Sequence, residues 1–215
     1  MPVIDMSKNQ KINMVKDDGS AIKRIFIGLK WDRNRFSQEG NYDLDIVGFL
    51  TNKERKAEYP EDLVNHQNHD NNNITWDWCE LSKDNLDGSD EKGITFDNIH
   101  FDEYMIVDSE KLPEGKEEFY ICLTIYRAVE RLQNLGMIDN AEMRIYDYDN
   151  PEEFCRRYDL SEDENFSRLN ATEVGKLYRY GNGFKFQALG RGYLGGTAEL
   201  FKTFGFDIDE GRDGN

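Results

Sequence analysis

The chain has 215 residues, of which 38% are hydrophobic and 13% are aromatic. This length suits one large β domain or two small ones, and the aromatic side chains can fill a core. The formal net charge is −16, and a surface of that sign repels nucleic-acid phosphates, anionic lipid headgroups and free oxyanions. The charge therefore argues against a nucleic-acid-binding protein and favours cations as ligands.

The cysteines and the N-terminal residues indicate a reducing compartment. Cys79, Cys122 and Cys155 are odd in number and have no C-x-x-C spacing, so we expect neither a disulfide framework nor a thiolate zinc site. Residues 1–10 contain no apolar run, and no stretch approaches ~20 apolar residues, so we expect neither a secretory leader nor insertion into a membrane. The sequence predicts a soluble cytoplasmic protein.

Strand patterns dominate the chain. In order, we expect strands over residues 24–29, 42–50, 103–107, 118–126, 143–148, 174–180 and 184–189. The strand over 42–50 has one apolar face, whereas its other face begins with Asp43 and Asp45 and ends with Val47 and Phe49. Such a strand would start at a polar mouth and end in the core. The last two strands flank Gly181-Asn182-Gly183, a strong signal for a hairpin turn.

Helix signals are fewer. An apolar stripe predicts a helix over residues 127–135 with Gly136 as its C-cap, and Thr197 begins a second short helix over 197–204. Many short strands and few helices predict a mostly β fold, a β-sandwich of two sheets with a few short flanking helices. We expect a single sandwich domain over residues 1–207 and a disordered tail over 208–215.

The strongest chemical signal is a pair of carboxylates at the start of the second strand. Asp43 and Asp45 are two positions apart, so in a strand both point to one face, with α-carbons ~7 Å apart. Two anions that close repel unless a cation lies between them, and carboxylate oxygens suit calcium and magnesium. Asp32, just after the first strand, is a third candidate. The alternative is a solvated strand entry, because Asp and Asn are common in turns.

A second acidic cluster has the composition of a calcium loop: Asp84-Asn85-Leu86-Asp87-Gly88-Ser89-Asp90-Glu91. It fails the EF-hand template, because Lys83 stands where Gly88 at position six requires a carboxylate. A metal site here would be an irregular loop that uses Asp oxygens and backbone carbonyls. The alternative is an ordinary acidic surface loop.

Two histidines, His66 and His69, could share a helical face and bind a transition metal. The asparagines around them favour a loop instead, and a histidine pair lacks the ligand count that zinc needs. We therefore favour a loop without a metal at these histidines.

A series of motifs lies in order along the chain: Gly28-Leu29-Lys30-Trp31-Asp32, Tyr42-Asp43-Leu44-Asp45, Asp84-Asn85-Leu86-Asp87-Gly88, Gln133-Asn134-Leu135-Gly136 and Gly190-Arg191-Gly192-Tyr193-Leu194-Gly195-Gly196. From about Asn9 to about Phe206 the sequence resembles the TerD family of tellurite-resistance and general stress proteins. The resemblance implies a β-sandwich that binds two calcium ions at acidic loops clustered at one end; for this chain we expect one or two ions.

Carried across residue by residue, the resemblance implies metal ligands at Asp32, Asp43, Asp45, Asp84, Asn85 and Asp87. The second loop would be closed by Asp102 and Glu103, just before the strand over 103–107, with Asp90 as the alternative ligand. Closure by Asp102 and Glu103 would make residues 92–101 mostly an insertion. Lys30 and Tyr126 depart from the family pattern, in which Gly and His are usual at these positions.

The implied function is that of a calcium-binding stress-response protein, a cation-dependent scaffold or sensor rather than an enzyme. Its partners would be proteins of a stress-response complex. In one alternative, this complex is bound at the inner face of the membrane. Direct chemistry on tellurite is not expected, because tellurite is an anion and three scattered cysteines are a poor reductant pair. Two alternatives stay open: a magnesium-dependent enzyme that acts on a phosphorylated substrate, and a metal-free interaction module.

Overall fold

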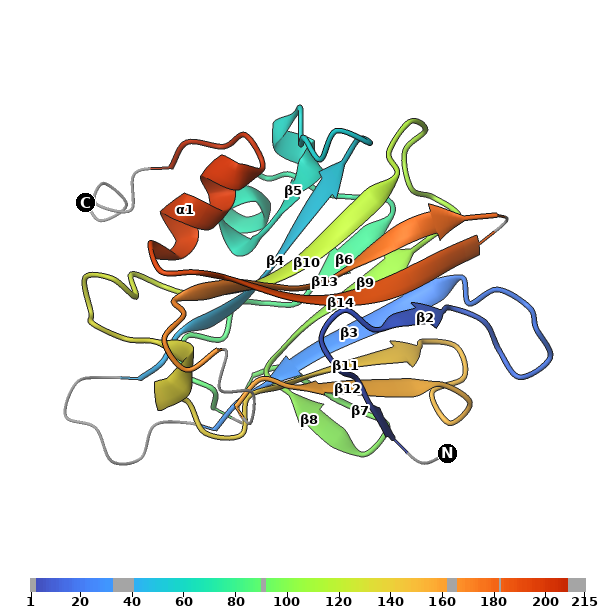
Figure 1. Cartoon of the computed structure of the whole chain (residues 1–215), viewed down its shortest axis with the longest axis horizontal. Helices are drawn as coiled ribbons and strands as arrows, with labels where there is room; N and C mark the ends of the chain where they lie inside the picture. The colour runs from blue at the N-terminus through green and yellow to red at the C-terminus, as the bar shows by residue number, and fades with distance from the viewer. Residues whose placement is uncertain (1–2, 33–40, 90–91, 162–165, 182, 209–215) are drawn as a thin grey trace.

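Two six-stranded sheets packed face to face form the body of the molecule (Figure 1). The computed structural model describes residues 3–32, 41–89, 92–161, 166–181 and 183–208. Neighbouring strands are antiparallel, apart from one parallel pair at the N-terminus, β1 (Ile4–Asp5) with β12 (Cys155–Asp159). The predicted β-sandwich of two sheets is confirmed.

The order of strands interleaves distant parts of the sequence. The first sheet runs β1, β12, β11 (Glu142–Asp147), β3 (Arg24–Lys30), β9 (Glu103–Asp108) and β6 (Cys79–Leu81). The second runs β2 (Lys11–Asn13), β14 (Gly183–Tyr193), β13 (Ala171–Tyr180), β10 (Glu118–Ile125), β4 (Leu44–Thr51) and β5 (Leu63–Val64). A separate hairpin pairs β7 (Ile94–Phe96) with β8 (Ile99–Phe101). The described helices are α1 (Gly196–Thr203) and three short turns, η1 (Pro60–Asp62), η2 (Gln67–Asn71) and η3 (Leu135–Met137).

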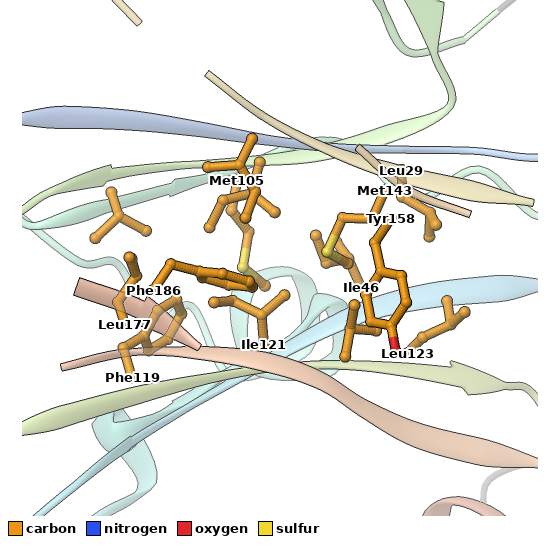
Figure 2. Close-up of a cluster of buried hydrophobic side chains, with 14 of the residues drawn as sticks. Leu29, Ile46, Met105, Phe119, Ile121, Leu123, Met143, Tyr158, Leu177 and Phe186 are labelled. Atoms are coloured by element: carbon orange, nitrogen blue, oxygen red, sulfur yellow. The ribbon is translucent and has the colours of Figure 1, made fainter. Parts of the chain in front are cut away.

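The main core lies between the two sheets. Figure 2 shows Leu29, Met105 and Met143 of the first sheet opposite Ile121 and Phe186 of the second, and all five side chains are fully buried. These residues come from the central strands of each sheet, where an apolar inner face is expected. Burial of this layer fixes the two sheets relative to each other.

Both sheets are also covered on their outer faces, by α1 on one side and the β7–β8 hairpin on the other (Figure 1). Phe49 of β4 stacks on Phe204 at the end of α1, with 4.1 Å between ring centroids. Phe96 of the hairpin stacks on Phe26 of β3, also at 4.1 Å. Strands covered on both faces can be apolar throughout, and β10 is buried along nearly its whole length for this reason.

The helix predicted over residues 127–135 is wrong. Residues 127–132 form turns and Leu135 begins η3, and Arg127 and Leu132 have positive φ angles of 51° and 54°, which an α-helix cannot contain. Ala128 and Leu135 are buried in the core, whereas Val129 and Leu132 are 48% and 81% exposed, so the apolar residues that suggested a helix do not share one packed face. The helix over 197–204 is confirmed as α1, although its N-cap is Gly195 and not Thr197.

The seven predicted strands correspond to β3, β4, β9, β10, β11, β13 and β14. Residues 92–101, expected as an insertion, form the β7–β8 hairpin and fill the outer face of the first sheet with Ile94, Phe96 and Ile99. Of the predicted tail over 208–215, all but Ile208 lies outside the described residues.

Candidate metal centre

Glu103, the first residue of β9, joins both sheets and the second acidic loop at one end of the sandwich. Its fully buried side chain accepts hydrogen bonds at Oε2 from the backbone N–H of Ile46 in β4 (2.8 Å) and at Oε1 from Asn85 N–H (3.2 Å). A carboxylate in this position is held firmly, because backbone donors on two elements fix both of its oxygens.

Three side chains from separate parts of the sequence converge beside Glu103. Asp45 comes from β4, His66 from the residue before η2, and Asp84 from the loop after β6. One potential ligand atom from each of these residues and from Glu103 lies within 4.8 Å of the other three. Three carboxylates and an imidazole at this spacing can surround a single cation.

Asp43 faces the same space as Asp45, as strand alternation predicts, and both line one cavity. Asp43 is buried, and its Oδ1 has no hydrogen-bond partner among the described residues. Oδ1 of Asp84 is also buried and also lacks such a partner. Buried oxygens without donors are costly. The residues present therefore fit a bound divalent cation, which these oxygens could coordinate.

The concentration of negative charge changes the acidity of the cluster. Burial, with the nearby charges of Asp84 and Glu103, raises the pKa of Asp43 to about 7. Burial and the same kind of repulsion raise the pKa of Asp45 well above its ordinary value. Burial also raises the pKa of Glu103, although His66 opposes the shift. A divalent cation would reverse these shifts, because it favours the ionised carboxylates.

A cavity of about 500 Å³ opens beside the cluster. Asp43, Asp45 and Asp84 form the acidic part of its wall. The rest of the wall includes Phe201 of α1, Ile208, Tyr126 and Arg127. The cavity leaves room for water or for a group of a ligand on a bound cation.

The loop after β6 is closed by direct hydrogen bonds. Asn85 is fully buried; its Oδ1 accepts from Gly88 N–H (3.2 Å) and its Nδ2 donates to Asp102 Oδ1 (3.2 Å). Asp102 Oδ2 in turn accepts from Trp31 N–H at 3.0 Å. Asp102 and Glu103 are adjacent, so their side chains leave the chain on opposite sides, and only Glu103 belongs to the four-residue group.

The remaining predicted ligands lie apart from this group. Asp32 is exposed and accepts a hydrogen bond at Oδ2 from Asn140 Nδ2 (2.7 Å). Asp87 accepts from Ser89 N–H (3.2 Å) within its own loop. Asp90 lies outside the described residues. The structure therefore brings Asp43, Asp45, Asp84 and Glu103 together and places Asp32, Asn85, Asp87 and Asp102 in hydrogen bonds of their own.

His66 is the member of the four-residue group that the sequence analysis considered as a ligand and set aside. We interpreted its surroundings as a loop, but residues 67–71 form the helical turn η2, and His66 lies in the helical region just before it. Its contact with the carboxylates depends on the pairing of β5 with β4, which the sequence pattern did not reveal. The available signal was the His66/His69 pair itself.

Fold and site together define a class of protein, a two-sheet β-sandwich with buried carboxylates converging at one end. A family model described as the TerD domain matches residues 2–204, and the chain belongs to the TerD family. The resemblance drawn from the sequence motifs is confirmed.

Relatives of known name cover nearly the whole chain. Protein YceE of Bacillus subtilis is 34% identical over 207 residues, which are 95% of this chain and 99% of that protein. General stress protein 16U of the same organism is 32% identical over 205 residues (95% and 98%). Tellurium resistance protein TerD of Serratia marcescens is 28% identical over 204 residues (95% and 98%). The chain thus belongs to a family of tellurium-resistance and general stress-response proteins.

A solved structure supports the fold. The crystal structure of a TerD homologue from Streptomyces coelicolor A3(2) aligns with a TM-score of 0.58 at 16% identity, over 83% of this chain and 94% of that one. Among the described residues, no helix has the length and hydropathy that a membrane span requires.

Proposed function

We propose that this chain is a calcium-binding protein of the stress response that acts as a cation-dependent scaffold or sensor. The observation that supports this proposal is the convergence of Asp43, Asp45, Asp84 and Glu103 at one end of the sandwich, where Oδ1 of Asp43 and Oδ1 of Asp84 are buried without a donor among the described residues. Calcium takes oxygen ligands in flexible geometry and accepts several carboxylates at once.

The cation would supply positive charge and a link between elements that otherwise repel one another. Asp45 belongs to β4, Glu103 to β9, and Asp84 to the loop after β6, so one ion would connect both sheets and that loop. Without the ion, mutual repulsion of the carboxylates opposes closure of this end of the sandwich. With it, the loops are held in one arrangement.

The ordered loop end then serves as a binding surface for a protein partner. In this proposal the protein is cytoplasmic and its partners are proteins of a stress-response complex. In one alternative, that complex is bound at the inner face of the membrane. The net charge of −16 makes a protein partner more plausible than nucleic acid or a bare anionic lipid surface.

The first test is isothermal titration of EDTA-stripped protein with calcium, repeated in excess magnesium. We expect binding at one or two sites that persists in magnesium, and a rise in melting temperature with calcium, because a ligand that binds only the folded state stabilises it. Absence of both binding heat and stabilisation would leave an acidic sandwich without a cation and would favour the metal-free interaction module.

The cavity beside the cluster favours one second candidate, a magnesium-dependent enzyme acting on a phosphorylated substrate. Magnesium keeps several waters and uses one or two carboxylates, so it would leave coordination positions open toward the cavity. Turnover of a phosphorylated substrate with magnesium, and its inhibition by calcium, would support this candidate over the scaffold.

A further inference from the structure

His66 adds a nitrogen atom to a site that otherwise offers oxygen. Its side chain is 7% exposed, and neither ring nitrogen has a hydrogen-bond partner among the described residues. Nε2 lies 3.2 Å from Glu103 Oε1; this contact lacks hydrogen-bond geometry and is an ion pair only when the imidazole is protonated. One of its ring nitrogens also lies within 4.8 Å of carboxylate oxygens from Asp45 and Asp84.

The backbone around His66 is fixed by asparagine side chains and not by solvent. Asn65 Oδ1 accepts from Asn68 N–H (2.9 Å), and Asn68 Nδ2 donates to the carbonyl oxygens of Pro60 and Leu63, both at 2.9 Å. Asn68 is buried. These bonds attach η2 to the edge strand β5, which itself pairs with β4, the strand that carries Asp45. The imidazole is therefore held at the carboxylates by the fold.

The two explanations of His66 differ in chemistry. As an imidazolium it would bring a single positive charge to a group of at least three carboxylates, leaving an excess of negative charge. As a neutral ligand it would donate a lone pair to a divalent ion that neutralises two of those charges. Calcium makes little use of nitrogen ligands, whereas imidazole suits zinc, iron and other first-row transition metals, and carboxylates suit manganese.

We infer that His66, Asp45, Asp84 and Glu103 form a binding site for a first-row transition-metal ion, and that Zn²⁺ and Mn²⁺ displace calcium from it. This inference rests on the proposed function in one respect: both assign a cation to the same group of carboxylates. Four donors satisfy zinc in its tetrahedral geometry, and manganese would take further oxygens from Asp43 or from water in the cavity. The scaffold would then respond to the supply of transition metals as well as calcium.

The test uses the full chain stripped with EDTA and titrated separately with Ca²⁺, Mn²⁺ and Zn²⁺. We expect Zn²⁺ to bind more tightly than Mn²⁺, following the Irving–Williams order, and both to bind at least about tenfold more tightly than Ca²⁺. Competition of each metal against calcium-loaded protein gives the same ranking without reliance on the heat of binding.

His66→Gln is the diagnostic variant, and His69→Gln is its matched control. His69 is three positions away, and its side chain is 41% exposed and pairs with Asp70. We expect His66→Gln to lose at least about tenfold in Zn²⁺ and Mn²⁺ affinity while its calcium affinity changes much less, because calcium does not depend on the nitrogen. His69→Gln should match the parent for all three ions.

Pulsed EPR of Mn²⁺-loaded protein gives an independent readout. Coupling of the electron spin to imidazole ¹⁴N is expected in the parent and in His69→Gln, and should be absent in His66→Gln. Absence of that coupling in the parent, or calcium binding tighter than zinc, would overturn the inference and leave the proposed function intact. Absence of binding for all three ions would overturn both.

Discussion

Asp45 illustrates how a single residue can have opposite effects on stability and on ligand binding. Its carboxylate is surrounded by those of Asp43, Asp84 and Glu103, and burial and their charges raise its pKa. In metal-free protein an ionised Asp45 therefore adds repulsion, whereas in metal-loaded protein it is a ligand. Removal of its charge should separate the two roles.

We expect Asp45→Asn to raise the melting temperature of EDTA-treated protein, by about 2–4 °C if the relief of repulsion is about 1 kcal/mol. The same change should abolish most of the further rise that calcium causes. Differential scanning calorimetry with EDTA and with calcium measures both effects. Asp32→Asn is the control, because Asp32 is exposed and bonded to Asn140; it should alter neither value. A parent-like calcium response in Asp45→Asn would remove Asp45 from the site.

The acidity of Asp43 predicts how the metal-free protein responds to pH. Its pKa is about 7 in the fold, against an ordinary unfolded value of ~3.9. A raised carboxyl pKa contributes stability that is complete below the unfolded value and is lost as pH rises through the folded one. The free energy of unfolding in EDTA should therefore fall between about pH 4 and pH 7, by roughly 1–4 kcal/mol from this residue.

Urea unfolding at a series of pH values, in EDTA and in calcium, measures this loss. Asp43→Asn should flatten the decline, and saturating calcium should reduce it in the parent, because the cation favours the ionised form. An equally steep decline in Asp43→Asn would assign the effect to other groups.

At the scale of elements, the loop after β6 is shaped by backbone constraints as well as by acids. Gly88 has a φ of 65°, and a Cβ there would lie 2.6 Å from Trp31 Nε1. Its N–H donates to Asn85 Oδ1, the same amide that reaches Asp102. Glycine is needed here both for the left-handed conformation and for the close approach of the loop to Trp31.

Gly88→Ala should therefore lower the free energy of unfolding more than the same substitution at a glycine that has a positive φ but no close neighbour. Gly115 provides that control, because its φ is 81° and a Cβ added there would meet no atom within 4 Å. We expect the positive φ to lower the free energy of unfolding by about 1 kcal/mol in both variants. The steric clash should lower it by at least about 1 kcal/mol more in Gly88→Ala. Urea denaturation of both variants measures the difference. Equal costs would mean that the loop moves away from Trp31 without penalty.

At the scale of the whole molecule, burial decides what the three thiols can do. Cys79, Cys122 and Cys155 are all free and buried. Burial raises the pKa of each thiol above its ordinary value, and the thiolate is the reactive form. From this burial we predict unreactive thiols and no reduction of tellurite by this chain.

We expect Ellman's reagent to label fewer than one thiol per chain in native protein over minutes, and three in guanidinium chloride. The native protein should also reduce no tellurite at neutral pH above a protein-free control. Rapid labelling of a native thiol, or tellurite reduction that a cysteine-to-serine variant abolishes, would contradict this prediction.

Local patterns in the sequence determined much of the architecture. Alternation and apolar runs located the seven long strands, and the positions of Asp43 and Asp45 two apart placed both on one face. Motif order along the chain identified the family. β5 and β6 were missed because two or three residues carry no periodicity that can be recognised.

Only the tertiary structure decided which acids meet. Asp102 and Glu103 looked equivalent as a closing pair, yet strand geometry sends Glu103 to Ile46 and Asp102 to Trp31. His66 joins the cluster because β5 pairs with β4, and Asp32 stays outside it beside Asn140. The physical reason is that a strand's periodicity is set by local backbone geometry, whereas the composition of a site depends on how two sheets and their loops pack across long sequence separations.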